Sequence, residues 1–226
     1  MLIAEDLLLL VTDDTSGRLF APAEQVDIGL AGANLLQLAL TDKVGLSGPG
    51  DEARPGRVVV RDPSPPGDPV LAAALEIVTA HQGSKPARVL QPLSKHLRRT
   101  LYERLAEGGV VRAEEGRVLG VVPIHRWPSQ DAGHEAEVRA LVTRALVEGA
   151  TPDPRSAALI ALLHALKCEH KVVDPRGHDV SKRKLRARSE EIAQGSWASD
   201  AVRSEIDEMT AAIVVAVLAV VVLSGA

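Results

Sequence analysis

The hydrophobic residues of this chain fall mainly into runs with helical spacing. The last run, residues 209–226, reads MTAAIVVAVLAVVVLSGA and contains no charged residue. A helix that is apolar on all sides must be surrounded by other apolar groups. The run is at the short end of the length that spans a bilayer, and it follows Glu205, Asp207 and Glu208 where a membrane helix usually carries Lys or Arg. These features favour a buried helix over a membrane anchor.

Other apolar segments predict the remaining framework. Helices are expected over residues 2–11, 24–40, 70–82, 93–109, 131–149 and 156–168. Asp68 followed by Pro69 matches an N-cap and a first helical position, and two glycines end the helix over residues 93–109. KVGL and RVVVRD are short strand candidates, and VVRAEEGRVLGVVPIHRWP alternates around a Glu-Glu-Gly turn as a β-hairpin does.

The connections between these segments are too short to separate domains. We therefore expect one mainly α domain over residues 1–226. It should be a helical bundle around a buried hydrophobic C-terminal helix, with a small projecting β-hairpin.

Composition limits the choice of partners. Hydrophobic residues make up 46% of the chain, which is ample for a sizeable core, whereas aromatic residues make up only 2%. The formal net charge of -4 gives no general attraction for nucleic acid or anionic lipid, so an anion site must come from local clusters. One cysteine excludes an internal disulfide, and no basic, apolar leader follows Met1. We expect a cytoplasmic protein.

Motifs that specify catalysis are missing from the sequence. It contains no phosphate-binding P-loop, no dinucleotide fingerprint and no Gly-x-Ser-x-Gly elbow. His164, Cys168 and His170 could offer zinc ligands, but a lone cysteine on an apolar helix is more typical of a core residue. The DPRGHD segment at residues 174–179 suits a turn better than acid-base chemistry. We expect no enzyme activity, no cofactor and no metal.

Two basic clusters are candidates for binding anions. In the first, Lys95 and Arg98 are spaced i and i+3 within the helix expected over residues 93–109, and Arg99 follows directly. Such spacing places cations on one helix face, where they could bind a phosphorylated headgroup. A solvated face opposite the leucine stripe is the simpler alternative.

The second cluster has five cations in seven residues. They are Lys182, Arg183, Lys184, Arg186 and Arg188. Such a run indicates an exposed helix, or a patch that meets a membrane surface or nucleic acid.

The expected hairpin offers another contact surface. Arg117, Val118 and Leu119 lie at or after its tip, and Trp127 lies at its far end. Apolar side chains there could enter a bilayer interface or pack on another subunit. A helix followed by a hairpin also has the outline of a winged helix, which binds DNA phosphates.

The order of these motifs resembles the Golgi phosphoprotein 3 family, which has bacterial members. The likeness rests on AEDLLLLV, on GLAGANLLQLAL followed by KVGL, and on LRRTLYERLAEGGVV with its hairpin. It continues through ALIALLHAL and the apolar helix after IDEM. The resemblance implies a helical domain around a hydrophobic helix, with a projecting hairpin.

The resemblance also implies a lipid site. Eukaryotic members of the family bind phosphatidylinositol 4-phosphate in a shallow basic pocket on the cytosolic face of the Golgi. Two of the pocket arginines correspond to Lys95 and Arg98 here, and Phe20 is the nearest counterpart of a pocket tryptophan. A third pocket arginine corresponds to Ala31 and is absent. The family hairpin is implicated in membrane insertion and self-association.

From these features we predict a non-enzymatic, peripheral membrane adaptor at the inner face of the membrane. Its partner would be an anionic phospholipid surface, with a possible homo-oligomer through the hairpin. The headgroup site would consist of Phe20, Lys95, Arg98 and Arg99, and the membrane-contacting hairpin would present Arg117, Val118 and Leu119. The alternative is a winged-helix-like nucleic-acid-binding protein.

Overall fold

The computed structural model describes residues 1–112, 114–118, 122–127, 130, 133–195 and 205–223. Ten helices and four short strands lie within these ranges. In chain order they are α1 Ile3–Leu10, α2 Ala23–Leu40, β1 Val44–Leu46, β2 Val58–Val60, α3 Pro69–Ala80, α4 Pro86–Ser94, α5 Leu97–Glu107, β3 Glu114–Val118, β4 Val122–Arg126, α6 Gly133–Val147, α7 Pro154–Ala165, α8 Glu169–Val172, α9 Lys182–Ala193 and α10 Glu205–Leu223.

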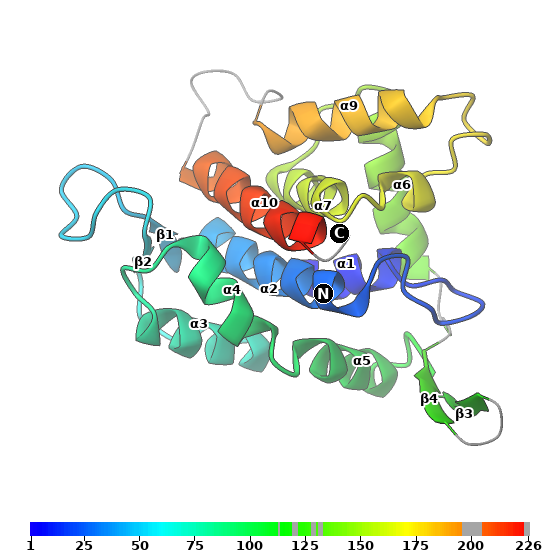
Figure 1. Ribbon diagram of the computed structural model, residues 1–226, viewed down its shortest axis with the longest axis horizontal. Coiled ribbons are helices and arrows are strands. Elements are labelled where there is room, and N and C mark those ends of the chain that lie inside the picture. The colour runs from blue at the N-terminus through cyan, green and yellow to red at the C-terminus, as the bar shows by residue number, and fades with distance from the viewer. Residues whose placement is uncertain (113, 119–121, 128–129, 131–132, 196–204, 224–226) are drawn as a thin grey trace.

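The helices form a bundle with α2 in its middle. α2 contacts α1, α4, α7 and α10 along its length, and Figure 1 shows α3 and α5 below it, α4 beside it, and α7 and α9 above it. Leu30, Leu35 and Leu36 of α2 have no exposed surface, and α7 is buried over almost all of its length. The mainly helical bundle with a small hairpin that the sequence predicted is therefore confirmed.

The C-terminal helix α10 is buried along one face. Its Ile213 and Val217 have no exposed surface and lie against α2, where Gly32 leaves room for them. Val215, on the opposite face, is 67% exposed. Among the helices of the described ranges, none combines the length and hydropathy that crossing a membrane requires.

One ion-pair network ties three helices together. Asp68 caps α3 by accepting a hydrogen bond from the Val70 N–H at 2.8 Å, as the sequence predicted. Arg104 of α5 contacts Asp68 at 2.9 Å and the buried Glu5 of α1 at 3.1 Å. α1, α3 and α5 are thus fixed relative to one another, and α5 forms one wall of the pocket described below.

The continuous helix predicted over residues 93–109 is wrong. α4 ends at Ser94 and α5 begins at Leu97, and between them His96 has a positive φ of 61°. Pro92 inside α4 removes a backbone donor, and Lys95 is extended, so the helix cannot continue through this junction. Lys95 and Arg98 are consequently not on one helix face.

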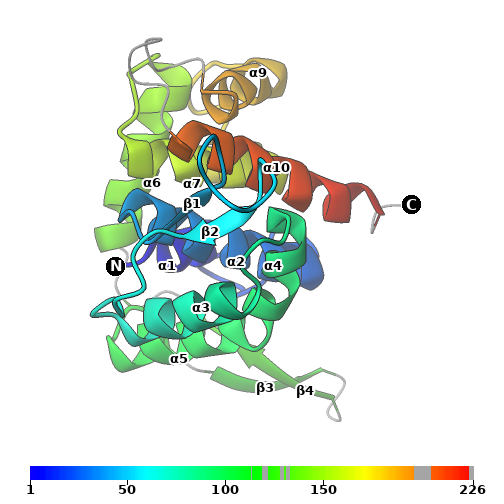
Figure 2. The ribbon, with the colours of Figure 1, turned by 90° about the vertical axis from the view of Figure 1, so that its left-hand side faces the viewer.

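The hairpin is present, but its turn is not where the sequence placed it. β3 and β4 are antiparallel, with Glu114 opposite Arg126 and Val118 opposite Val122. The Glu-Glu-Gly stretch therefore lies within β3, because the chain reverses after Val118. Arg117 and Val118 end β3, whereas Leu119 lies outside the described residues. The hairpin projects from the body beside α5 (Figures 1 and 2).

Candidate functional site

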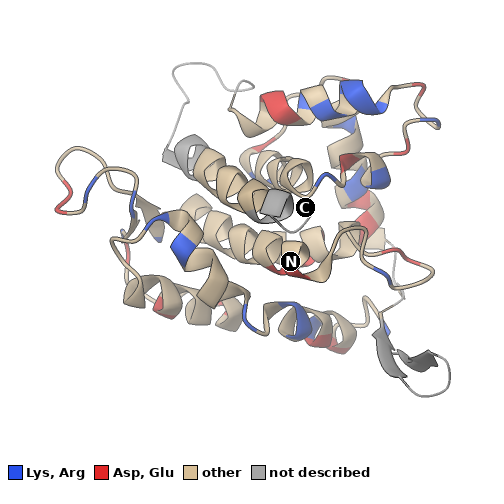
Figure 3. Cartoon of the chain, viewed as in Figure 1, with Lys and Arg blue, Asp and Glu red and all other residues tan. Residues whose placement is uncertain are grey.

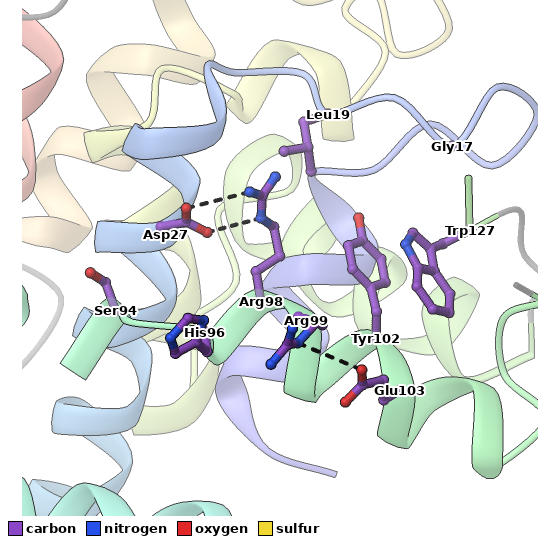
Figure 4. Close-up of a pocket in the computed structure, with 10 residues that line it drawn as sticks. All are labelled: Gly17, Leu19, Asp27, Ser94, His96, Arg98, Arg99, Tyr102, Glu103 and Trp127. Atoms are coloured by element: carbon purple, nitrogen blue, oxygen red, sulfur yellow. Dashed lines mark hydrogen bonds and ion pairs between the residues drawn. The ribbon is translucent and has the colours of Figure 1, made fainter. Parts of the chain in front are cut away.

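A pocket of about 780 Å³ opens where the start of α2, the junction of α4 and α5, and the loop after α1 meet. This volume is in the range of small-molecule and headgroup sites. The lining residues, drawn in Figure 4, are Gly17, Leu19, Asp27, Ser94, His96, Arg98, Arg99, Tyr102, Glu103 and Trp127.

The N-terminus of α5 opens into this pocket. His96 is its N-cap residue but makes no side-chain cap, and Arg98 and Arg99 are the second and third residues of the helix. The first amides of a helix have no partner within the helix and carry a partial positive charge, so cations there are unfavourable and anions favourable. The two arginines strengthen a local preference for a negatively charged ligand.

Each of the two arginines has a carboxylate partner. Arg98 Nε lies 2.9 Å from Asp27 Oδ1, and Arg98 Nη2 donates to Asp27 Oδ2 at 3.4 Å. Arg99 Nε lies 3.7 Å from Glu103 Oε1. Burial raises the pKa of Asp27 although the neighbouring Arg98 lowers it. The pocket therefore contains two arginines and two carboxylates, and is less basic than a simple arginine site.

Aromatic side chains make the second wall. The rings of Tyr102 and Trp127 stack with centroids 4.9 Å apart and planes 4° from parallel. The Thr12 hydroxyl donates to the Leu8 carbonyl at 2.6 Å and lies 2.8 Å from the Tyr102 hydroxyl, which therefore donates to it. Burial raises the pKa of Tyr102. This stack fixes the base of the hairpin on α5.

The loop after α1 closes the rim. Thr12 and Leu19 form an isolated antiparallel bridge, and the Asp13 carboxylate accepts both the backbone N–H and the hydroxyl of Ser16 at 2.7 Å. These bonds hold a tight turn. Leu19 lines the pocket beside the guanidinium of Arg98, as Figure 4 shows.

The structure brings two of the four predicted headgroup residues into the pocket. Arg98 and Arg99 line it. Lys95 is exposed at the junction between α4 and α5, outside the lining residues, and Phe20 is half-buried against the hydrophobic core. Ala31 is fully buried, one turn along α2 from Asp27.

Sequence reasoning missed Asp27, Tyr102 and Glu103 as pocket residues. One signal for Asp27 was available, because it is the only acidic residue beyond the first turn of a mostly apolar helix. Nothing in the spacing of the chain connects Tyr102 with Trp127. Their stacking depends on how the hairpin returns to α5.

The other candidates from the sequence lie away from this pocket. Cys168 is buried, which raises the pKa of its thiol to about 12, and burial also lowers the pKa of His164. Asp174 accepts backbone N–H groups of Arg176 and Gly177, as a turn residue does. In the part of the chain that the structure describes, no three His, Cys, Asp or Glu side chains are grouped to hold a metal ion.

The second basic cluster is on α9, at the opposite end of the molecule from α5 and the hairpin (Figures 1 and 3). Lys182, Arg183, Lys184 and Arg186 are exposed there. Arg188 instead pairs with Glu191 at 3.1 Å. One flat membrane surface cannot contact α9 and the pocket at the same time.

Comparison with protein families matches residues 3–209 to Golgi phosphoprotein 3 (GPP34). The matched span contains every residue that lines the pocket. A search among curated proteins finds no match.

Proposed function

The chain belongs to the Golgi phosphoprotein 3 family, and we propose that it is a peripheral membrane adaptor that binds anionic phospholipid headgroups, the class that includes phosphatidylinositol 4-phosphate. The observation that carries this proposal is the uncapped N-terminus of α5, which presents Arg98 and Arg99 to a pocket of headgroup size. Helix amides and guanidinium groups are both donors suited to phosphate oxygens.

Arg99 is the more available of the two arginines. Its side chain is 70% exposed, and its partner Glu103 is 56% exposed at a distance of 3.7 Å. Exposed pairs one helical turn apart contribute only about 0.3–0.5 kcal/mol, so a phosphate can displace Glu103 readily. The exposed Lys95 beside the pocket adds attraction to a negatively charged surface.

Cations alone would bind weakly. Each contributes about 1 kcal/mol near an anionic membrane surface, so a second attachment is needed. The hairpin supplies it in this proposal, because it projects from the body and its base is fixed to α5 by the stack of Trp127 on Tyr102. The hairpin would enter the bilayer interface or join a second copy of the chain, which is the role that the sequence predicted for Val118 and Leu119.

The role is that of an adaptor and not of an enzyme. The pocket is lined by cations, hydroxyl groups and aromatic rings, which are groups that can hold a headgroup. When the protein is bound at the inner face of the membrane, its remaining surface would be free to bind protein partners. The exposed cations of α9 are directed away from the membrane in this orientation.

Vesicle co-sedimentation tests the proposal. Wild type is compared with the Arg98→Gln, Arg99→Gln double variant and with an Arg183→Gln, Lys184→Gln double variant of α9, which loses the same formal charge. We expect binding to vesicles that contain phosphatidylinositol or phosphatidylinositol 4-phosphate and not to neutral vesicles. The pocket variant should bind at least about tenfold more weakly, whereas the α9 variant should bind as wild type does.

Equal losses in both variants would show general charge attraction and would overturn the pocket assignment. Absence of binding to every vesicle would overturn the lipid proposal. Salt-sensitive binding of duplex DNA by the same protein would then favour the winged-helix alternative.

A further inference from the structure

The two arginines of the pocket are held very differently. The pair between Arg99 and Glu103 lies on one exposed helix face. The pair between Arg98 and Asp27 joins two helices, its side chains are 32% and 28% exposed, and it makes contact through both carboxylate oxygens. A ligand therefore finds Arg99 available, while Arg98 is already neutralised by a carboxylate.

Asp27 keeps unused acceptor capacity inside the pocket. Its Oδ1 is buried and, among the described residues, accepts no hydrogen bond of good geometry, although Arg98 Nε lies 2.9 Å away. Its Oδ2 accepts a hydrogen bond from Arg98 Nη2, but this bond is long at 3.4 Å. An ionised carboxylate has about four acceptor positions, so Oδ2 can accept further donors.

Burial raises the pKa of Asp27 although Arg98 lowers it. This direction agrees with a carboxylate that has few hydrogen-bond donors around it, because burial penalises the charged form. A hydroxyl group of a ligand would supply a further donor to Oδ2. A second negative charge at the same place would instead be repelled by the carboxylate, since like charges at short range in a partly desolvated site are unfavourable.

We propose that Asp27 makes the pocket select hydroxyl-bearing phosphodiester headgroups, such as phosphatidylinositol, over headgroups that carry an added phosphomonoester. This inference rests on the proposed lipid-binding function. Arg99 and the first amides of α5 bind the phosphodiester, and Asp27 accepts a hydrogen bond from a headgroup hydroxyl. A phosphomonoester must either face the Asp27 carboxylate or break the pair of Asp27 with Arg98.

The test compares phosphatidylinositol with phosphatidylinositol 4-phosphate in vesicles adjusted to equal surface charge with phosphatidylserine. Wild type, Asp27→Asn and Glu103→Gln are measured, and each variant removes one negative charge from the pocket. Wild type should bind phosphatidylinositol at least as tightly as phosphatidylinositol 4-phosphate. Asp27→Asn should raise the affinity for phosphatidylinositol 4-phosphate relative to phosphatidylinositol about tenfold. Glu103→Gln should raise both affinities and leave their ratio unchanged.

The outcomes separate this inference from the proposed function. Binding of both lipids with a wild-type preference for phosphatidylinositol 4-phosphate would overturn the role of Asp27, whatever the variants do, and would leave lipid binding intact. An equal change of the ratio in Asp27→Asn and Glu103→Gln would overturn it too, because any lost charge would then suffice. Failure of wild type to bind either lipid would overturn both proposals.

Discussion

Gly32 allows α10 to lie close to α2, and adding one methyl group there tests how the C-terminal helix is packed. A Cβ atom on Gly32 would lie 2.8 Å from Ile213 Cγ2 and 3.2 Å from Leu162 Cδ2. Both distances are below ordinary van der Waals contact, and both neighbours are fully buried, so neither can move aside freely.

The expected cost of Gly32→Ala follows from two opposing effects. Overpacking in a dense core typically costs about 1–3 kcal/mol. Alanine is better than glycine inside a helix by about 0.5–1 kcal/mol. The variant should therefore lose about 1–2 kcal/mol of unfolding free energy, which corresponds to a Tm lower by roughly 2–4 °C per kcal/mol for a chain of this size.

Urea denaturation followed by circular dichroism measures this loss. Gly48→Ala is the control, because a Cβ at Gly48 meets no atom within 4 Å. Ile213→Ala, combined with Gly32→Ala, completes a double-mutant cycle. The methyl group at position 32 would then occupy space that Ile213 vacates, so the double variant should cost about 0.5–2 kcal/mol less than the sum of the single variants. Strict additivity, or a Gly32→Ala variant as stable as the control, would refute the packing of α10 on α2.

Three further predictions concern single residues. Arg104→Gln should lower the unfolding free energy by about 1–3 kcal/mol, because it leaves the buried Glu5 and the cap residue Asp68 without their shared partner, and urea denaturation would detect this. Burial raises the pKa of Glu135 to about 7, so the folded state binds more protons than the unfolded state between about pH 4.5 and 7. Stability should accordingly fall as the pH rises through that window, and Glu135→Gln should reduce this slope; a slope unchanged in the variant would contradict the assignment. Cys168 is 1% exposed and burial raises its pKa to about 12, so iodoacetamide at pH 8 should modify it only after unfolding.

Helix positions could be predicted from the sequence because apolar spacing, caps and glycine stops act locally. Asp68 with Pro69 marked the start of α3 correctly. The break at His96 could not be predicted in the same way, since the leucine spacing continues through it and the left-handed backbone is visible only in the structure. This break affects the predicted headgroup site, because it prevents Lys95 and Arg98 from sharing one helix face.

The pocket, too, could be predicted from the sequence only in part. Its arginines were recognisable as a cluster in the sequence, since they are neighbours in the chain. Their carboxylate partner Asp27 is 71 residues away from Arg98 in sequence and meets it only after α2 packs on α5. The charge balance of the pocket is therefore a tertiary property, which composition and spacing do not contain.

Quenching of Trp127 fluorescence by brominated lipid tests most directly whether the pocket side of the protein meets the membrane. Trp197→Phe leaves Trp127 as the single tryptophan of the chain. On vesicles that contain phosphatidylinositol and brominated phosphatidylcholine, we expect quenching of Trp127 that the Arg98→Gln, Arg99→Gln variant abolishes. Sedimentation with the same vesicles without any quenching would contradict the account, because the protein would then bind the membrane through another surface.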